Sequence, residues 1–174
     1  MMITCNNELG GLLGEAEAMA IYRELMAGGT LLEFCQQYMN HADPRVARNA
    51  LWVLTKANHQ AAQQLRPLLH RLMDLSMQAG NSSVCRLSLN LVERMGLQTD
   101  DVRTDFLDFC LEHMADAQEY PGIQSLCMKL AFRMCSFYPE LRGELLRTLQ
   151  AMEADCYTPA VRSVRHRILT GRMR

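Results

Sequence analysis

The sequence predicts an all-α protein built from repeated helical hairpins, and three observations support this. Capped segments recur with origins at Val46, Val84, Ile123 and Val161, at steps of 38, 39 and 38 residues. Within these segments apolar or small residues fall at offsets 0, +4, +7 and +8, which share one face of a helix with 3.6 residues per turn. Gly and Pro are few and lie mostly where the segments end.

The offset pattern defines one helix in each repeat. A small residue at offset +4 lets a neighbouring helix approach closely, whereas the fourth copy has Arg165 there. We interpret that copy as terminal, with no further repeat to pack against. The pattern comprises Val46, Ala50, Val53 and Leu54; Val84, Ser88, Leu91 and Val92; Ile123, Cys127, Leu130 and Ala131; and Val161, Ile168 and Leu169.

The composition is that of one globular domain over residues 1–174, with 49% hydrophobic and 21% charged residues. Aromatic residues are 6% and methionines number 13, which predicts an aliphatic core with thioethers filling its gaps. The seven cysteines form no C-x-x-C pair, and no apolar run reaches the ~18 residues of a membrane span. We therefore expect a cytoplasmic protein that has no membrane association.

The N-terminal part is predicted to close the repeat array. Residues 1–7 are expected to be a frayed end, and Gly10, Gly11 and Gly14 delay a helix until about Glu15. Gly28 and Gly29 stop that helix, so residues 1–29 form the cap and Thr30 starts the next helix. The offsets 0, +4, +7 and +8 are imitated here by Leu12, Ala16, Met19 and Ala20.

Helices are then expected over residues 44–57, 60–78, 82–96, 99–116, 120–137, 139–153 and 158–171. Pro67 costs about 3 kcal/mol in a helix interior, so that helix should kink or begin near Gln64. The helix before each offset pattern completes a hairpin. The expected repeats are residues 30–57, 60–96, 99–137 and 139–172.

Two helices in about 38 residues, the second opened by Asp43 and Pro44 and followed by Val46 and Ala50, resemble the HEAT family of α-solenoid repeats. The later openings are Asn81-Ser82-Ser83, Tyr120-Pro121-Gly122 and Thr158-Pro159-Ala160. An arginine directly after the valine occurs only as Arg162, so an armadillo-type relative stays open. The resemblance implies a right-handed α-α superhelix of about four hairpins after an N-terminal capping helix.

In HEAT proteins the second helix of each hairpin lines the concave face, and the resemblance implies the same here. Offsets +2, +6 and +10 share one side of these helices. Seven of the twelve positions are basic and none is acidic, although the net charge is −1. The candidate binding residues are Arg48, Trp52, Lys56, Arg86, Asn90, Arg94, Lys129, Arg133 and Arg167.

Such a stripe would attract an acidic peptide or nucleic-acid phosphates. The alternative is structural. Lys56, Arg94 and Arg133 lie near helix C-termini, where cations are favoured without any ligand, and Arg48 and Arg86 could pair with acids on neighbouring hairpins.

No established catalytic or cofactor motif occurs in the sequence. The five histidines lack metal-ligand spacing; Cys110 with His113 comes closest, and packing is the simpler interpretation. We therefore expect no cofactor, no metal and no catalysis. HEAT-like DNA alkylation repair glycosylases use a concave tryptophan and aspartate. Trp52 fits that arrangement, but the stripe has no acid.

The sequence thus predicts a scaffold that binds another protein or an acidic peptide through its concave basic face. The alternative is a nucleic-acid-binding protein related to those glycosylases. A third hypothesis is self-association through Val161, Val164 and Ile168, should no repeat cover the last helix. The sequence leaves the oligomeric state open.

Overall fold

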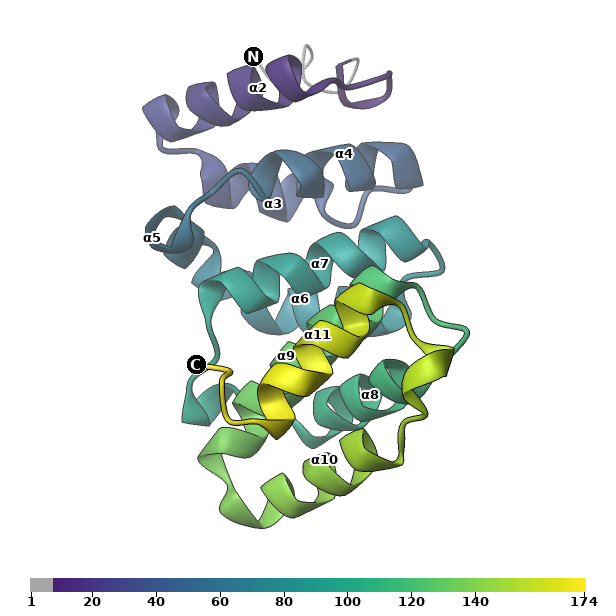
Figure 1. The fold of residues 1–174 in the computed structure, drawn as a ribbon. Helices are drawn as coiled ribbons and strands as arrows, with labels where there is room; N and C mark the ends of the chain where they lie inside the picture. The colour runs from purple at the N-terminus through teal and green to yellow at the C-terminus, as the bar shows by residue number, and fades with distance from the viewer. Residues whose placement is uncertain (1–7) are drawn as a thin grey trace. The chain divides into compact units, whose positions relative to one another are not determined.

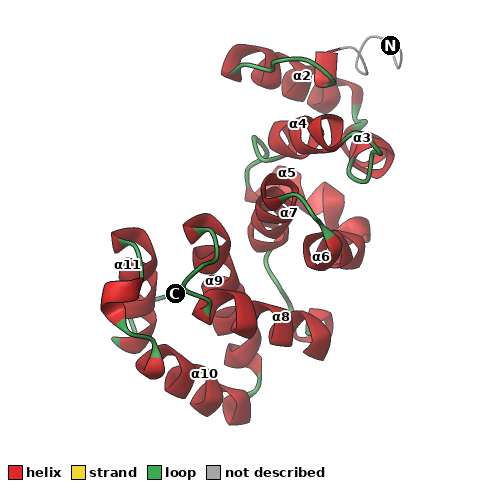
Figure 2. Cartoon of the chain, turned by 90° about the vertical axis from the view of Figure 1, so that its right-hand side faces the viewer, coloured by secondary structure: helices red, strands yellow, loops and turns green. Residues whose placement is uncertain are grey.

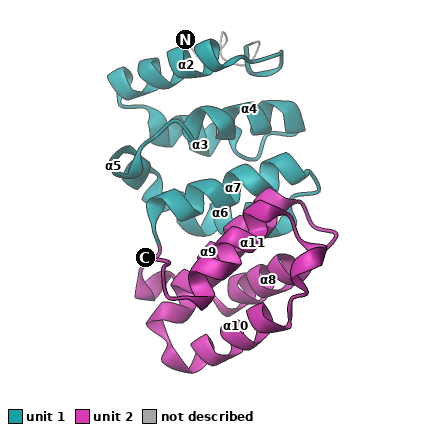
Figure 3. Ribbon diagram, viewed as in Figure 1, with its two compact units in different colours: residues 1–96 teal, residues 97–174 magenta. Residues whose placement is uncertain are grey.

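The structure, a computed structural model, describes residues 8–174. The predicted frayed end and Cys5 lie outside the described residues. Throughout the described range the elements are helices joined by loops, with no strand (Figure 2), so the predicted all-α class is confirmed. The chain divides into two compact units, residues 1–96 and residues 97–174 (Figure 3), which are taken here one at a time.

Unit 1 contains a single helix followed by two hairpins. The second helices stack, because α2 packs on α4 and α4 packs on α7, while the first-helix elements α3 and η1 pack on each other (Figure 1). The elements are α2 (Glu15–Gly28), α3 (Leu31–Tyr38), α4 (Pro44–Leu54), α5 (His59–Ala62), the 3₁₀ helix η1 (Gln63–Leu68), α6 (Leu69–Gln78) and α7 (Ser82–Met95).

Unit 2 contains two hairpins. Helix α9 is central to it, because α8, α10 and α11 all pack against α9. The elements are the 3₁₀ helix η2 (Thr99–Asp101), α8 (Thr104–Ala115), α9 (Pro121–Phe137), α10 (Pro139–Ala151), the 3₁₀ helix η3 (Ala154–Cys156) and α11 (Pro159–Leu169).

Side chains cap three of the four second helices, and the fourth, α9, begins at Pro121 without a side-chain cap. The Asp43 carboxylate accepts a hydrogen bond from the Arg45 backbone N–H at 2.9 Å. Asn81 and Thr158 cap α7 and α11 in the same way, and proline takes the first position of α4, α9 and α11. The recurring origins therefore reflect recurring helix starts.

The predicted core positions are confirmed for the first three copies, where every residue at offsets 0, +4, +7 and +8 is buried. The fourth copy differs. Val161, Val164 and Ile168 are buried there, and Leu169 is half-buried. Arg165 extends instead to the end of α10, where its Nε donates to the Leu149 carbonyl at 2.6 Å. The last helix therefore buries offsets 0, +3 and +7.

The expectation that the last helix lacks a cover is wrong. Val161, Val164 and Ile168 are all buried, and α11 packs on α9 within unit 2. The apolar stripe has a partner inside the chain. It therefore supplies no surface for self-association.

The predicted register of the N-terminal helix is also wrong. Helix α2 begins at Glu15 with Gly14 as its N-cap, so Leu12 precedes the helix and is fully exposed. The buried residues are Ala18, Ile21 and Leu25. These match offsets +4, +7 and +11 counted from Gly14, which shifts the predicted pattern by two residues. Helix α2 packs on α4, and the assignment of residues 1–29 as the N-terminal cap stays a prediction.

Two predicted helices are interrupted. The segment 60–78 is divided into α5, η1 and α6, because Pro67 lacks an N–H and its ring excludes the ordinary helical carbonyl contact. The segment 99–116 is divided into η2 and α8, because the backbone of Val102 and Arg103 is extended. No helix within residues 8–174 is long and apolar enough to cross a membrane.

Candidate functional site

The nine stripe residues are divided between the two units. Arg48 and Trp52 lie on α4, Lys56 lies two residues beyond the end of α4, and Arg86, Asn90 and Arg94 lie on α7, all in unit 1. Lys129 and Arg133 lie on α9 and Arg167 lies on α11, in unit 2. Each set is considered within its own unit.

Arg48 fixes a buried amide. Its Nε and Nη2 donate to Asn49 Oδ1 at 3.1 and 2.8 Å. Asn49 is fully buried, and its Nδ2 donates to the carbonyls of Leu9 and Gly11 at 2.7 and 3.1 Å. The guanidinium of Arg48 therefore completes a network that holds the segment before α2 against α4.

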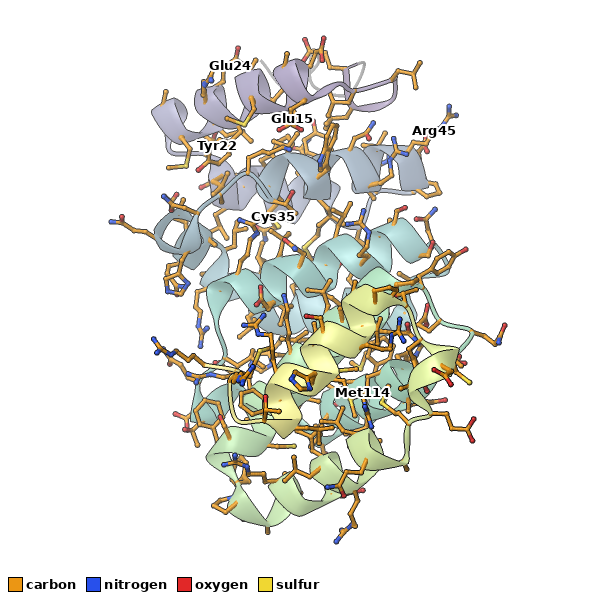
Figure 4. All side chains as sticks on the ribbon, in the orientation of Figure 1. Glu15, Tyr22, Glu24, Cys35, Arg45 and Met114 are labelled. Atoms are coloured by element: carbon orange, nitrogen blue, oxygen red, sulfur yellow. The ribbon has the colours of Figure 1, made fainter. Side chains whose placement is uncertain are left out.

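Lys56 joins α4 to α2. Its Nζ lies 2.7 Å from Glu15 Oε2 and 4.6 Å from the centre of the Trp52 ring. The Lys56 side chain is only 14% exposed. Figure 4 shows Glu15 on the side of α2 that faces α4. The carboxylate and the indole thus both stabilise this ammonium group, and the ring lies beside a cation of its own chain.

Arg94 holds the end of α7 to the preceding repeat. Its Nε donates to Asn90 Oδ1 at 2.9 Å and its Nη1 donates to the Ala57 carbonyl at 2.9 Å. Side chains of α5 and η1 contact the carbonyl groups at the end of α7. His59 Nδ1 lies 2.8 Å from the Arg94 carbonyl oxygen, and Gln63 Nε2 donates to the Met95 carbonyl oxygen at 2.7 Å. The unpaired carbonyls of a helix C-terminus are satisfied here by the neighbouring hairpin.

Arg133 is engaged in a similar way in unit 2. Its Nε donates to the Leu97 carbonyl at 3.3 Å, and its guanidinium carbon lies 4.8 Å from the centre of the Phe137 ring. Four of the seven stripe cations, Arg48, Lys56, Arg94 and Arg133, therefore have partners within their own unit.

The other three cations differ. Arg86 and Arg167 are exposed and Lys129 is half-buried. Within residues 8–174 the structure gives none of these three side chains a hydrogen bond, ion pair or ring contact. No contact among the described residues accounts for their positive charge.

The Cys110 and His113 pair is used for packing. His113 Nδ1 lies 2.6 Å from Glu119 Oε2, and its ring lies 4.0 Å from the Phe109 ring. Cys110 is buried and forms a hydrogen bond with Cys127, which together with burial raises the pKa of the Cys127 thiol well above its usual value. No group of three metal-ligating side chains comes together in the described part of the chain.

The buried thiols are poor nucleophiles. Burial raises the pKa of Cys35 to about 12 and that of Cys135 to about 11. At neutral pH these side chains are therefore protonated, and only the thiolate reacts readily. Their surroundings are those of small core residues.

The structure also contains a groove that the sequence analysis did not identify. It has a volume of about 680 Å³ and lies between α2 and α3, so it is named the α2/α3 groove. The side chains around it include Leu12 and four glutamates, Glu8, Glu17, Glu24 and Glu33. One signal was present in the sequence, because Glu17 and Glu24 are seven residues apart and so share one side of a helix.

Comparison with known proteins identifies the repeat. The family model described as a HEAT repeat domain matches residues 5–172, nearly the whole chain. No curated protein and no solved structure matches the chain. The match agrees with the stacked hairpins seen in each unit and with the proline at the helix starts Pro44, Pro121 and Pro159. The chain therefore belongs to the HEAT repeat family.

Proposed function

We propose that this chain is a non-catalytic binding protein that recognises an acidic segment of another protein through those cations of its second helices that have no partner among the described residues. HEAT repeats are helical repeats of the protein-interaction type, which supports the general class. The stripe supports the sign of the partner, because offsets +2, +6 and +10 carry no acid in any of the four copies. In this proposal the protein acts in the cytoplasm and needs no cofactor.

One observation carries the proposal. Internal pairing explains Arg48, Lys56, Arg94 and Arg133. It does not explain Arg86, Lys129 and Arg167. A charge that has no partner in the folded chain contributes little to folding and remains available to a partner, so we assign contacts to Arg86 in unit 1 and, separately, to Lys129 and Arg167 in unit 2.

Charge reversal tests the proposal. The probe is a fluorescent peptide rich in Glu, and the variant is Arg86→Glu with Lys129→Glu and Arg167→Glu. We expect the affinity to fall by at least about tenfold and the wild-type binding to weaken as salt rises. The control reverses three exposed arginines on first helices, Arg71→Glu, Arg142→Glu and Arg147→Glu, and should retain binding. Equal loss in both variants would show only a response to net charge and would contradict the assignment.

Nucleic acid is the second candidate ligand, because an exposed guanidinium such as Arg86 also suits phosphate oxygens. A gel-shift series on single-stranded and duplex DNA separates the two ligands. Retardation at low salt that disappears in the same triple variant would favour nucleic acid. A glycosylase activity would also need a carboxylate on this face, and offsets +2, +6 and +10 have none.

A further inference from the structure

The α2/α3 groove lies where a complete repeat would have another helix. In unit 1 the first helix α3 packs against α4, the second helix of its own hairpin, and against η1, a first-helix element of the next hairpin. Helix α2 stacks on α4 in the row of second helices. Among the described residues that precede α2, only Glu8 and Leu9 are helical, and residues 10–14 contain no helix.

The lining of the groove matches the position of a first helix paired with α2. A first helix paired with α2 would contact α2 and α3, and these two helices supply most of the lining. The floor is apolar and consists of Ile21, Leu25, Phe34 and Tyr38. The edge includes Ala20 and Leu12, which are exposed. Because the surface is shaped by the packing rule of the repeat, its natural occupant is a helix with an apolar stripe.

The charge of the groove selects among such helices. Its border carries Glu8, Glu17, Glu24 and Glu33, and no lysine or arginine is among the residues that line it. Figure 4 shows Glu24 on the side of α2 turned away from Glu15, so this carboxylate is not directed at Lys56. A helix flanked by cations would find complementary charges there, and an acidic helix would be repelled.

We propose that the α2/α3 groove binds an amphipathic helix of a partner protein, with apolar residues on one face and Lys or Arg beside them, in the position that a first helix paired with α2 would take. The groove includes none of the second-helix cations and has the opposite charge preference. The apolar stripe supplies the contact with the floor, and the flanking cations face the four glutamates.

A peptide series with the full chain tests the charge preference. The probes are 18-residue helical peptides that share one leucine stripe at i, i+3, i+4 and i+7 and carry Lys, Gln or Glu beside it. We expect affinity to fall in the order Lys, Gln, Glu, with at least about tenfold between the Lys and Glu forms and a decrease for the Lys form as salt rises. Equal affinities, or no binding of the Lys form at 100 μM (about a hundred times a micromolar Kd), would overturn the proposal.

Variants of exposed residues locate the binding without disturbing the core. Glu17→Lys with Glu24→Lys should weaken the Lys peptide by about tenfold and relieve the repulsion of the Glu peptide. Its matched control is Glu140→Lys with Glu144→Lys on α10, where both side chains are exposed. Ala20→Arg should obstruct the groove, whereas Ala160→Arg, at another exposed alanine, should not. Loss of binding in the controls as well would contradict the location.

Two other occupants would be recognised by the same experiment. If a second copy fills the groove, sedimentation of the wild-type chain should show a dimer that Ala20→Arg dissociates. If the chain's own residues 1–7 fill the groove, the Lys peptide should bind to the Ile3→Asp variant and not to the wild-type chain. Either result would overturn binding of a partner helix. Hydrogen exchange that slows in α2 and α3 when the Lys peptide is added would support it.

Discussion

Units 1 and 2 each contain two HEAT hairpins, yet they use equivalent positions differently. In unit 1 three stripe residues have partners. Arg48 contacts Asn49, Lys56 contacts Glu15, and Arg94 donates to the Ala57 carbonyl. In unit 2 Arg133 reaches the Leu97 carbonyl, while Lys129 and Arg167 have no partner among residues 97–174. The comparison shows that the repeat pattern fixes the buried face, and that cations on the opposite face pair within the chain in some copies and have no partner among the described residues in others.

The two units also differ at offset +4. Ala50 in unit 1 is fully buried on α4, which is packed by α2, α3 and α7. Arg165 in unit 2 is half-buried and reaches the Leu149 carbonyl at the end of α10. The need for a short side chain at +4 therefore depends on how many helices surround the position.

Substitution of the residue at offset +4 should change the free energy of unfolding the most. Ala50→Arg buries a guanidinium that has no partner, which costs several kcal/mol and approaches the whole stability of a small domain. Arg165→Ala removes one hydrogen bond and should cost about 1 kcal/mol. Circular dichroism during urea unfolding measures both, with Ala50→Ser as the small-residue control. If the Ala50→Arg variant unfolds at the same urea concentration as the wild type, offset +4 in unit 1 is not a position of close helix contact.

Removing the buried side-chain amide of Asn49 or Gln124 should lower the free energy of unfolding by an intermediate amount. Each effect should be local to the unit that contains the residue. Asn49→Ala leaves the Leu9 and Gly11 carbonyls without donors and should cost about 2–3 kcal/mol. Gln124→Ala removes the hydrogen bond to the Asp116 carbonyl and should cost about 1–2 kcal/mol.

Hydrogen exchange with mass spectrometry distinguishes these two variants. Exchange should accelerate in residues 8–13 for Asn49→Ala and near Asp116 for Gln124→Ala. Gln78→Ala, at an exposed helix end, is the control. Faster exchange throughout both units in either variant would indicate that the units do not open separately.

Neutralising Lys56 should give the smallest effect. Lys56→Met removes the ion pair with Glu15 and the cation above Trp52, and together these should contribute about 1 kcal/mol or less. A double-mutant cycle with Glu15→Gln isolates the ion pair, and the fluorescence of Trp52, the only tryptophan, reports on the ring. Additive effects of the two changes would mean that the Glu15 contact contributes nothing to stability.

Much of the fold could be predicted because its signals are local. The caps at Asp43 and Asn81 and the spacing that begins at Val46 lie within single helices, so one sequence contains them. The register of α2 could not be predicted in this way. Leu12 and Ala16 have the right spacing, but the helix starts only after Gly14, and packing on α4 then selects Ala18 and Ile21.

The candidate site was predicted only as a set of side chains. Spacing placed Arg48, Arg86 and Arg94 on one side of their helices, but it could not show which cations have internal partners. Arg48 pairs with the adjacent Asn49, but other partners are distant in the sequence, as Lys56 and Glu15 show with a separation of 41 residues. The α2/α3 groove was missed for the same reason, because Leu12 and Phe34 come from separate segments.

The sequence by itself determined the repeat, the helix starts and the apolar face of each second helix, because these depend on neighbours within a few turns. The tertiary structure decided which charged side chains are used in folding, that Val161 and Ile168 are covered by α9, and that an apolar groove with an acidic border lies between α2 and α3. These features depend on contacts between segments far apart in the chain, and such contacts form only when the hairpins stack.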